Sequence, residues 1–195
     1  MATIQILPEV AGYTSVFKKG TRESAWQRDV TVHYGHPIAA ALQRGAKDQY
    51  DYYGRCKRAA ILREWIDGVP MEAIEEKYSI TPFGGNVGPG DVTGFAGRTR
   101  LYLRAAHGIA DVLLLGEGPD EEAVDVLVQR LEAGLPEGAV GLMDLPVALT
   151  RGEYLALYNA GHSTTQSVTV LATVELELYV GRRSARRLRR TSQTS

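Results

Sequence analysis

A cluster of arginines near the carboxyl end is the strongest chemical feature of the sequence. Residues 181–195 contain six arginines and no acid, so they carry +6 while the rest of the chain carries −7. These arginines are Arg182, Arg183, Arg186, Arg187, Arg189 and Arg190. Guanidinium groups bind phosphates well, and a turn at Gly181 would expose backbone N–H groups beside them. The pattern predicts contact with a polyanion such as a nucleic acid.

Two apolar residues indicate how this basic segment is held. Ala185 and Leu188 lie three residues apart, so they share one face of a helix over Ser184–Arg190. That face would dock the helix on the body of the protein and leave the arginines outside. A frayed, solvated basic tail is the alternative interpretation, and the docking face favours the helix.

Other motifs that could carry chemistry are incomplete. The glycine-rich loop Gly84–Gly90 is not followed by Lys-Ser or Lys-Thr, so it is not expected to bind ATP. His33 and His36 lack further ligands for a metal. Cys56 lies within an apolar helical face, which is typical of a buried thiol. We therefore expect no enzyme active site and no cofactor.

Composition points to an ordinary folded protein. The chain has 195 residues, of which 44% are hydrophobic and 23% are charged, and this balance supports a packed core. The longest apolar runs are too short to span a membrane, and the amino-terminal residues do not resemble a secretory signal. A single cysteine is typical of a reducing compartment, so we expect a cytoplasmic protein.

Hydrophobic spacing predicts a mainly α fold. Apolar residues recur at three- and four-residue intervals, with caps and glycines at several of the expected ends. The first predicted helix begins at about Asp48 and its run ends at Gly68, and further helices are predicted over residues 71–78, 91–114, 121–133 and 151–160. Residues 79–90 are expected to form a loop between two of these helices.

Two segments leave the element type open. Gln27–Tyr34 has β-branched character and could contribute to a short β-hairpin near the amino terminus. Residues 167–180 fit a strand or a helix, and we favour a helix, followed by a hairpin at Gly181. The predicted organisation is an uncertain segment 1–47, a helical bundle 48–140, a helix-hairpin-helix-like domain 141–190 and a polar tail 191–195.

The order of several short motifs resembles a known family. Trp65-Ile66, Gly90-Asp91, Leu131–Gly134, Leu157–Gly161 and Val180–Arg182 follow one another at characteristic spacing. This order resembles the carboxyl-terminal part of archaeal replication-fork DNA helicases, superfamily 2 relatives of HELQ and of the helicase half of polymerase theta. The resemblance covers about residues 48–190. It implies a ratchet bundle followed by a helix-hairpin-helix domain.

The sequence departs from that family in ways that bear on function. The motor motifs are absent. The arginine and tryptophan that the family's ratchet helix presents to the translocating strand fall on Gly94 and Leu101. Arg98 could substitute for them, and Arg100 and Arg104 form a neighbouring stripe. The first hairpin, at 145–149, lacks the usual glycines, so the resemblance leaves Gly181 as the phosphate-binding turn.

Together these features predict a non-catalytic DNA-binding accessory subunit. A separate ATPase motor would supply the chemistry, and RNA remains an alternative ligand because a hairpin turn does not read the 2′-hydroxyl. If about five phosphates are engaged, the log–log salt slope should be about −3.5 to −4.5. A protein-interaction scaffold, whose basic helix docks on a protein, is the alternative function.

Overall fold

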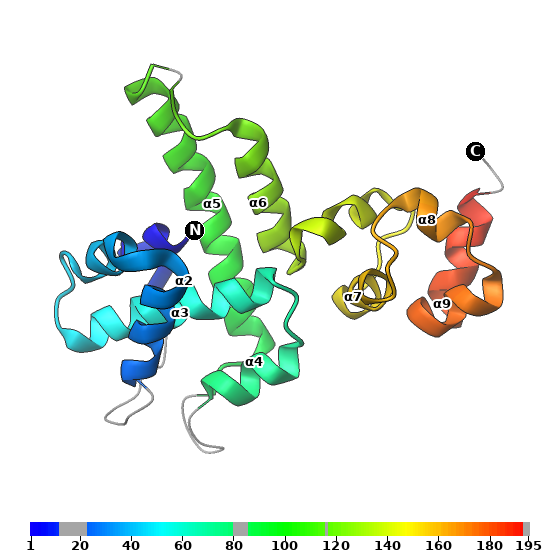
Figure 1. Ribbon diagram of the computed structural model, residues 1–195, viewed down its shortest axis with the longest axis horizontal. Coiled ribbons are helices and arrows are strands. Elements are labelled where there is room, and N and C mark those ends of the chain that lie inside the picture. The colour runs from blue at the N-terminus through cyan, green and yellow to red at the C-terminus, as the bar shows by residue number, and fades with distance from the viewer. Residues whose placement is uncertain (12–22, 80–85, 116, 193–195) are drawn as a thin grey trace.

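The computed structural model describes residues 1–11, 23–79, 86–115 and 117–192, and every regular element in these ranges is a helix (Figure 1). The mainly α fold class is therefore confirmed. In chain order the elements are η1 Ala2–Ile6, α1 Pro8–Ala11, α2 Glu23–Gln43, α3 Gln49–Ile66, α4 Met71–Tyr78, α5 Pro89–Leu113, α6 Glu121–Ala133, η2 Glu137–Asp144, α7 Arg151–Asn159, α8 Thr165–Thr169 and α9 Thr173–Ser192.

Local capping signals fix several helix ends. Asp120 accepts a hydrogen bond from the Ala123 backbone N–H at 3.1 Å and begins α6, while Gly134 ends it with φ +67°. A capping box joins Thr150 and Glu153 at the start of α7. The bounds predicted for these two helices from the sequence are confirmed to within one residue.

Helix α3 forms the centre of the amino-terminal bundle. Helices α2, α4, α5 and α6 all contact it, and η1 closes one side. Its inward face carries Cys56, Ile61 and Leu62, each with no exposed surface. Burial of this continuous apolar face against four helices supplies the main drive for folding this part of the chain.

The β-hairpin expected near the amino terminus does not form in the described residues, because Gln27–Tyr34 lies within α2. Trp26 and Val30 are one helical turn apart and are both buried, whereas Val32 is 72% exposed. Packing of this face on α3 therefore outweighs the local preference of valine and threonine for strands. Gly35, at φ +80°, kinks the helix just before Pro37.

A second apolar cluster lies in the carboxyl-terminal part. It begins at Leu135 and runs to Leu188, whereas the amino-terminal cluster ends at Leu131. Figure 1 shows α7, α8 and α9 to one side of the amino-terminal bundle, connected to it through η2. The chain thus builds two packed units in sequence order.

Arg151, the first residue of α7, joins the two units. Its Nε donates to the Gly134 carbonyl at 2.7 Å, and its Nη2 donates to the carbonyls of Trp65 and Val69 at 3.1 and 2.8 Å. The guanidinium also lies over the Trp65 ring, 4.3 Å from its centre. A Cβ at Gly134 would overlap both Trp65 and Arg151, so this position requires glycine.

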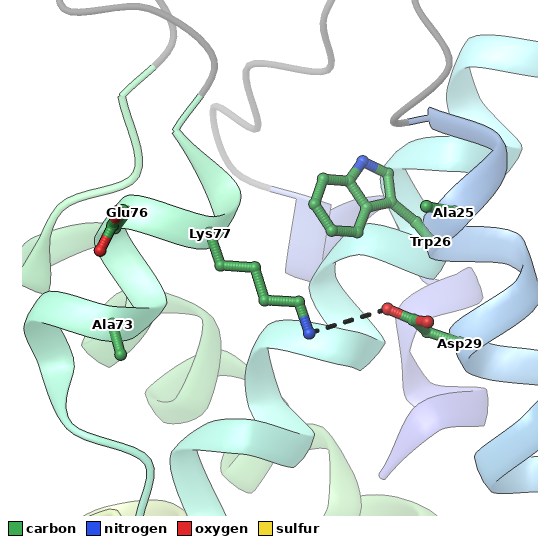
Figure 2. Close-up of a pocket in the computed structure, with 6 residues that line it drawn as sticks. All are labelled: Ala25, Trp26, Asp29, Ala73, Glu76 and Lys77. Atoms are coloured by element: carbon green, nitrogen blue, oxygen red, sulfur yellow. Dashed lines mark ion pairs between the residues drawn. The ribbon is translucent and has the colours of Figure 1, made fainter.

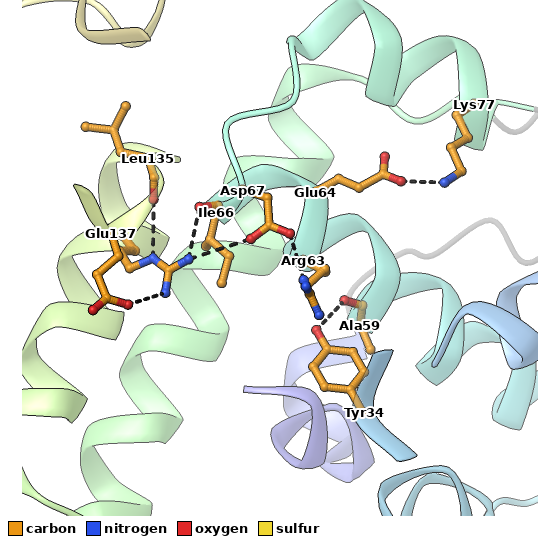
Figure 3. A network of polar contacts seen from close by, with 10 residues as sticks. Tyr34, Ala59, Arg63, Glu64, Ile66, Asp67, Lys77, Leu135 and Glu137 are labelled. Carbon is orange, nitrogen blue, oxygen red and sulfur yellow. Dashed lines mark hydrogen bonds and ion pairs between the residues drawn. The ribbon is translucent and has the colours of Figure 1, made fainter. Parts of the chain in front are cut away.

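A second arginine strengthens the same junction. Arg130 of α6 donates to the carbonyls of Ile66 and Leu135 and pairs with Asp67 and Glu137 (Figure 3). Asp67 in turn accepts from Arg63 at 2.7 Å. These contacts tie the ends of α3 and α6 together at the point where the chain enters η2.

Helix α9 consists of two helical segments that meet at Gly181. Gly181 has φ +67° and ψ 164°, values far from those of a helix, and its surroundings leave space for the turn. The segment 167–180 is helical where the structure describes it as regular, in α8 and the first half of α9. The helical interpretation of this ambiguous stretch is therefore confirmed.

Candidate nucleic-acid interface

The second half of α9 presents arginines on one side and apolar residues on the other. Ala185 is fully buried and Leu188 is 4% exposed. At 100° per residue, four exposed arginines lie within an arc of about 100° on the opposite side of the helix. We call this the basic face, and its members are Arg183, Arg186, Arg187 and Arg190.

The two remaining arginines of the cluster contact the protein itself. Arg182 lies 3.5 Å from the Glu177 carboxylate. Arg189 is half-buried and donates to the Thr169 carbonyl at 2.9 Å. Arg189 thus helps to hold α9 against α8, whereas Arg183 and Arg186 enter no ion pair with the residues that the structure describes.

Glu153 of α7 fixes the position of the basic segment. Burial alone would raise the pKa of Glu153, but hydrogen bonds from Ser184 and Thr150, together with the charge of Arg187, hold it below its usual value. The contact joins the start of α7 to the second half of α9. The basic face is therefore carried on a docked helix.

The arginines of α5 are engaged within the chain. Arg98 donates to the Val10 carbonyl at 3.4 Å, and its guanidinium lies against Gly94. Arg100 pairs with Glu132 at 2.6 Å, and Arg104 pairs with Asp125 at 3.0 Å. The structure gives each of these three side chains a role in holding α5 to its neighbours, and their contact with a nucleic-acid strand remains a prediction.

Comparison with known proteins identifies the family of the amino-terminal bundle. Residues 2–134 match the family model described as "Archaeal helicase, domain 4". The chain belongs to this family. The match begins at residue 2, so residues 2–47, whose structure the sequence left uncertain, lie within the matched region.

Two curated relatives extend this result. The chain is 30% identical over 124 residues to the ATP-dependent DNA helicase Hel308 of Pyrococcus abyssi, which covers 63% of this chain and 16% of the relative. It is 28% identical over 130 residues to Hel308 of Pyrococcus horikoshii, covering 67% of this chain and 17% of the relative. The chain spans about one sixth of the length of these helicases.

A surface pocket of the amino-terminal bundle is bordered by an ion pair between two helices. One surface pocket of about 610 Å³ lies between α2 and α4 and is lined by Trp26, Asp29 and Lys77, among others (Figure 2). Lys77 there pairs with Asp29 at 3.8 Å and with Glu64 of α3. The Lys77–Asp29 pair thus joins α4 to α2 beside this pocket, which indicates a structural contact between helices.

The described residues contain neither a candidate metal site nor a candidate membrane span. No group of three or more His, Cys, Asp and Glu side chains there could hold a metal ion. Within those ranges no helix is long and apolar enough to cross a membrane. Cys56 is fully buried, and burial raises the pKa of its thiol to about 11. The loop at 84–90 is described only from residue 86.

Sequence reasoning missed the contacts that integrate the amino-terminal residues. Gln5 is fully buried, donates to the Thr99 hydroxyl of α5 at 2.8 Å, and accepts from Arg58 of α3 at 3.2 Å. The four-residue spacing of Trp26 and Val30 is the one local signal that could have assigned the segment to the bundle. The Gln5 contacts join residues 94 and 53 positions apart, so no local pattern predicts them.

Proposed function

We propose that this chain is a non-catalytic nucleic-acid-binding accessory subunit of a DNA helicase. The basic face of α9 binds backbone phosphates, and Gly181 shapes the turn of a helix-hairpin-helix-like element. The observation that carries the proposal is a row of exposed arginines on a helix whose opposite face is buried. A docked cationic helix pays less ordering entropy on binding than a disordered tail would.

Membership of the helicase family also supports a nucleic-acid-binding role. The matched relatives are named ATP-dependent DNA helicases, and this chain matches their domain 4 region without motor motifs. In this proposal a motor on a partner chain supplies ATP hydrolysis and translocation, in the cytoplasm. This chain would contribute phosphate contacts that hold the strand while the motor moves.

A salt series tests the proposal. Fluorescence anisotropy of labelled single-stranded, duplex and forked DNA, with a single-stranded RNA of equal length, measures the affinity for each. With four arginines on phosphates, the log–log slope should be about −2.8 for single strands and about −3.6 for duplex. Affinity that does not change with salt, or no binding at low salt, contradicts the proposal.

A protein-interaction scaffold is the second candidate function. The observation that favours it is the exposed apolar surface of α5, where Leu101 is 66% and Val112 is 73% exposed. Replacing all six arginines of the cluster by alanine separates the candidates. The change abolishes nucleic-acid binding if the chain is a nucleic-acid-binding subunit. It leaves any residual nucleic-acid binding unchanged if the chain is a protein-interaction scaffold.

A further inference from the structure

A row of small and apolar residues runs along the outer face of α5. Its members follow a four-three-four spacing and lie within an arc of about 60° at 100° per residue. We call this the α5 row, and its members are Leu101, Ala105, Gly108 and Val112. Leu101 is 66% exposed and Val112 is 73% exposed, and the flanking Ile109 is 60% exposed.

The fold leaves this row uncovered. Thr99 and Leu103 lie on the opposite side of α5, where Thr99 is fully buried and Leu103 packs against the core of the bundle. Helix α6 lies along one flank of α5. Arg104 pairs there with Asp125 of α6, and His107 contacts the Pro119 carbonyl just before α6 begins. Figure 1 shows α5 and α6 side by side and projecting beyond α2 and α3.

The pattern of the row is that of a helix-pairing surface. A four-three-four apolar spacing is the seam that two helices share when they pack side by side. Ala105 and Gly108 in its middle allow the backbones to approach closely, while Leu101 and Val112 supply apolar contact at the two ends. Burying them would remove large side chains from water on both partners.

We propose that the α5 row binds the same row of a second copy in an antiparallel arrangement. Leu101 of one copy then packs against Val112 of the other, and Ala105 packs against Gly108. The surface is self-complementary under a twofold axis, as a closed dimer requires. The proposal is independent of the nucleic-acid function of α9.

Flanking charges select the antiparallel orientation. Arg104 and Asp111 lie on the same flank of the row, seven residues apart. Antiparallel pairing brings equivalent flanks together, so that Arg104 of each copy lies beside Asp111 of the other. A parallel pair would instead place these charges beside the other flank, where Tyr102 and Ile109 lie. Arg104 already pairs with Asp125 of α6 on this flank, and its side chain is still more than half-exposed.

Charge also argues against a nucleic acid at the outer end of the row, near Val112. Residues 105–129 contain six acids and no lysine or arginine. These acids surround the outer end of the row and would repel phosphates. In an antiparallel dimer they lie toward the end of the partner helix that carries Arg98, Arg100 and Arg104. The dimer would also carry two basic faces, which raises avidity for a long nucleic acid.

Sedimentation velocity over a concentration series tests the pairing. The native chain should shift from monomer to dimer as concentration rises, and Val112→Asp should remain monomeric. The matched control is Val174→Asp on α9, since Val174 is 77% exposed outside the row. Circular dichroism checks that both variants are folded. A native chain that stays monomeric up to millimolar concentration, or a Val112→Asp variant that still dimerises, overturns the proposal.

Disulfide trapping tests the orientation. Leu101→Cys and Val112→Cys chains are oxidised separately and as a mixture, with the native Cys56 buried as an internal control. An antiparallel pair gives the crosslinked dimer in the mixture only. Identical positions then lie about 16 Å apart along the helix, beyond the reach of a disulfide of about 7 Å between Cα atoms. Efficient crosslinking of each variant with itself contradicts the antiparallel arrangement.

Discussion

At the scale of single residues, Arg151 does most to connect the two packed units. It satisfies three carbonyl oxygens and lies on the Trp65 ring, and burial lowers the pKa of its guanidinium to about 10. The group remains charged at neutral pH. All three acceptors are backbone carbonyls at or just beyond helix ends, so removal of Arg151 leaves them without this donor at a semi-buried joint.

Replacement of Arg151 by alanine should therefore destabilise the protein. We expect the free energy of unfolding to fall by about 2 kcal/mol or more, since charge-assisted hydrogen bonds are lost together. Urea denaturation followed by tryptophan fluorescence measures the change, with Trp65 reporting from the joint. The control Arg28→Ala removes an exposed arginine of α2 and should change stability by about 0.5 kcal/mol at most. Equal stability of the two variants would contradict the role of Arg151.

The burial of Cys56 predicts low reactivity of its thiol in the native protein. Burial raises the pKa of its thiol to about 11, so the reactive thiolate is scarce at neutral pH. The native protein should react very slowly with a thiol reagent, and the thiol should react at once after unfolding in urea. Spectrophotometric titration of thiols follows both reactions. Rapid stoichiometric modification of the native chain would show that Cys56 is accessible.

At the scale of elements, the contact between α7 and α9 should make stability depend on acid pH. The pKa of Glu153 is lowered in the folded chain, so its ionised form stabilises the fold at neutral pH. That contribution is lost as pH falls through the lowered pKa of Glu153. Glu153→Gln should lower the Tm at neutral pH and reduce its further decline in acid.

Thermal denaturation across pH measures this effect, with Glu76→Gln on exposed α4 as the matched control. The control should keep the acid dependence of the native chain. If Glu153→Gln has the same Tm profile as the native chain, Ser184 and Arg187 do not hold the basic helix through Glu153.

Helices whose ends are marked by local residues could be predicted from the sequence. The cap Asp120, the left-handed Gly134 and the Thr150–Glu153 box act within one turn, so their pattern is visible along the chain. Gln27–Tyr34 could not be assigned in this way. Its strand-like composition is overridden by packing of Trp26 and Val30 on α3, which depends on residues far along the chain.

At the scale of the whole molecule, one part of the candidate site could be predicted from the sequence and another part depends on the fold. The arginines of α9 and the turn at Gly181 follow from adjacent residues, and the structure places them on a docked helix. The ion pairs of Arg100 and Arg104 depend on how α6 lies beside α5, and no local pattern gives that placement. Similarity to domain 4 of archaeal helicases supplies the family, and the basic face supplies the proposed activity.

Matched charge removal tests the central claim most directly. Arg183, Arg186 and Arg187 are replaced by alanine in one variant, and Arg28, Arg44 and Lys47, exposed on the amino-terminal bundle, in the other. Anisotropy with the same labelled DNA compares their affinities and salt slopes. The account predicts that the first variant loses most of its affinity, with a slope flatter by about 2 to 3. It predicts near-native binding for the second variant, and equal losses in both would contradict a basic face on α9.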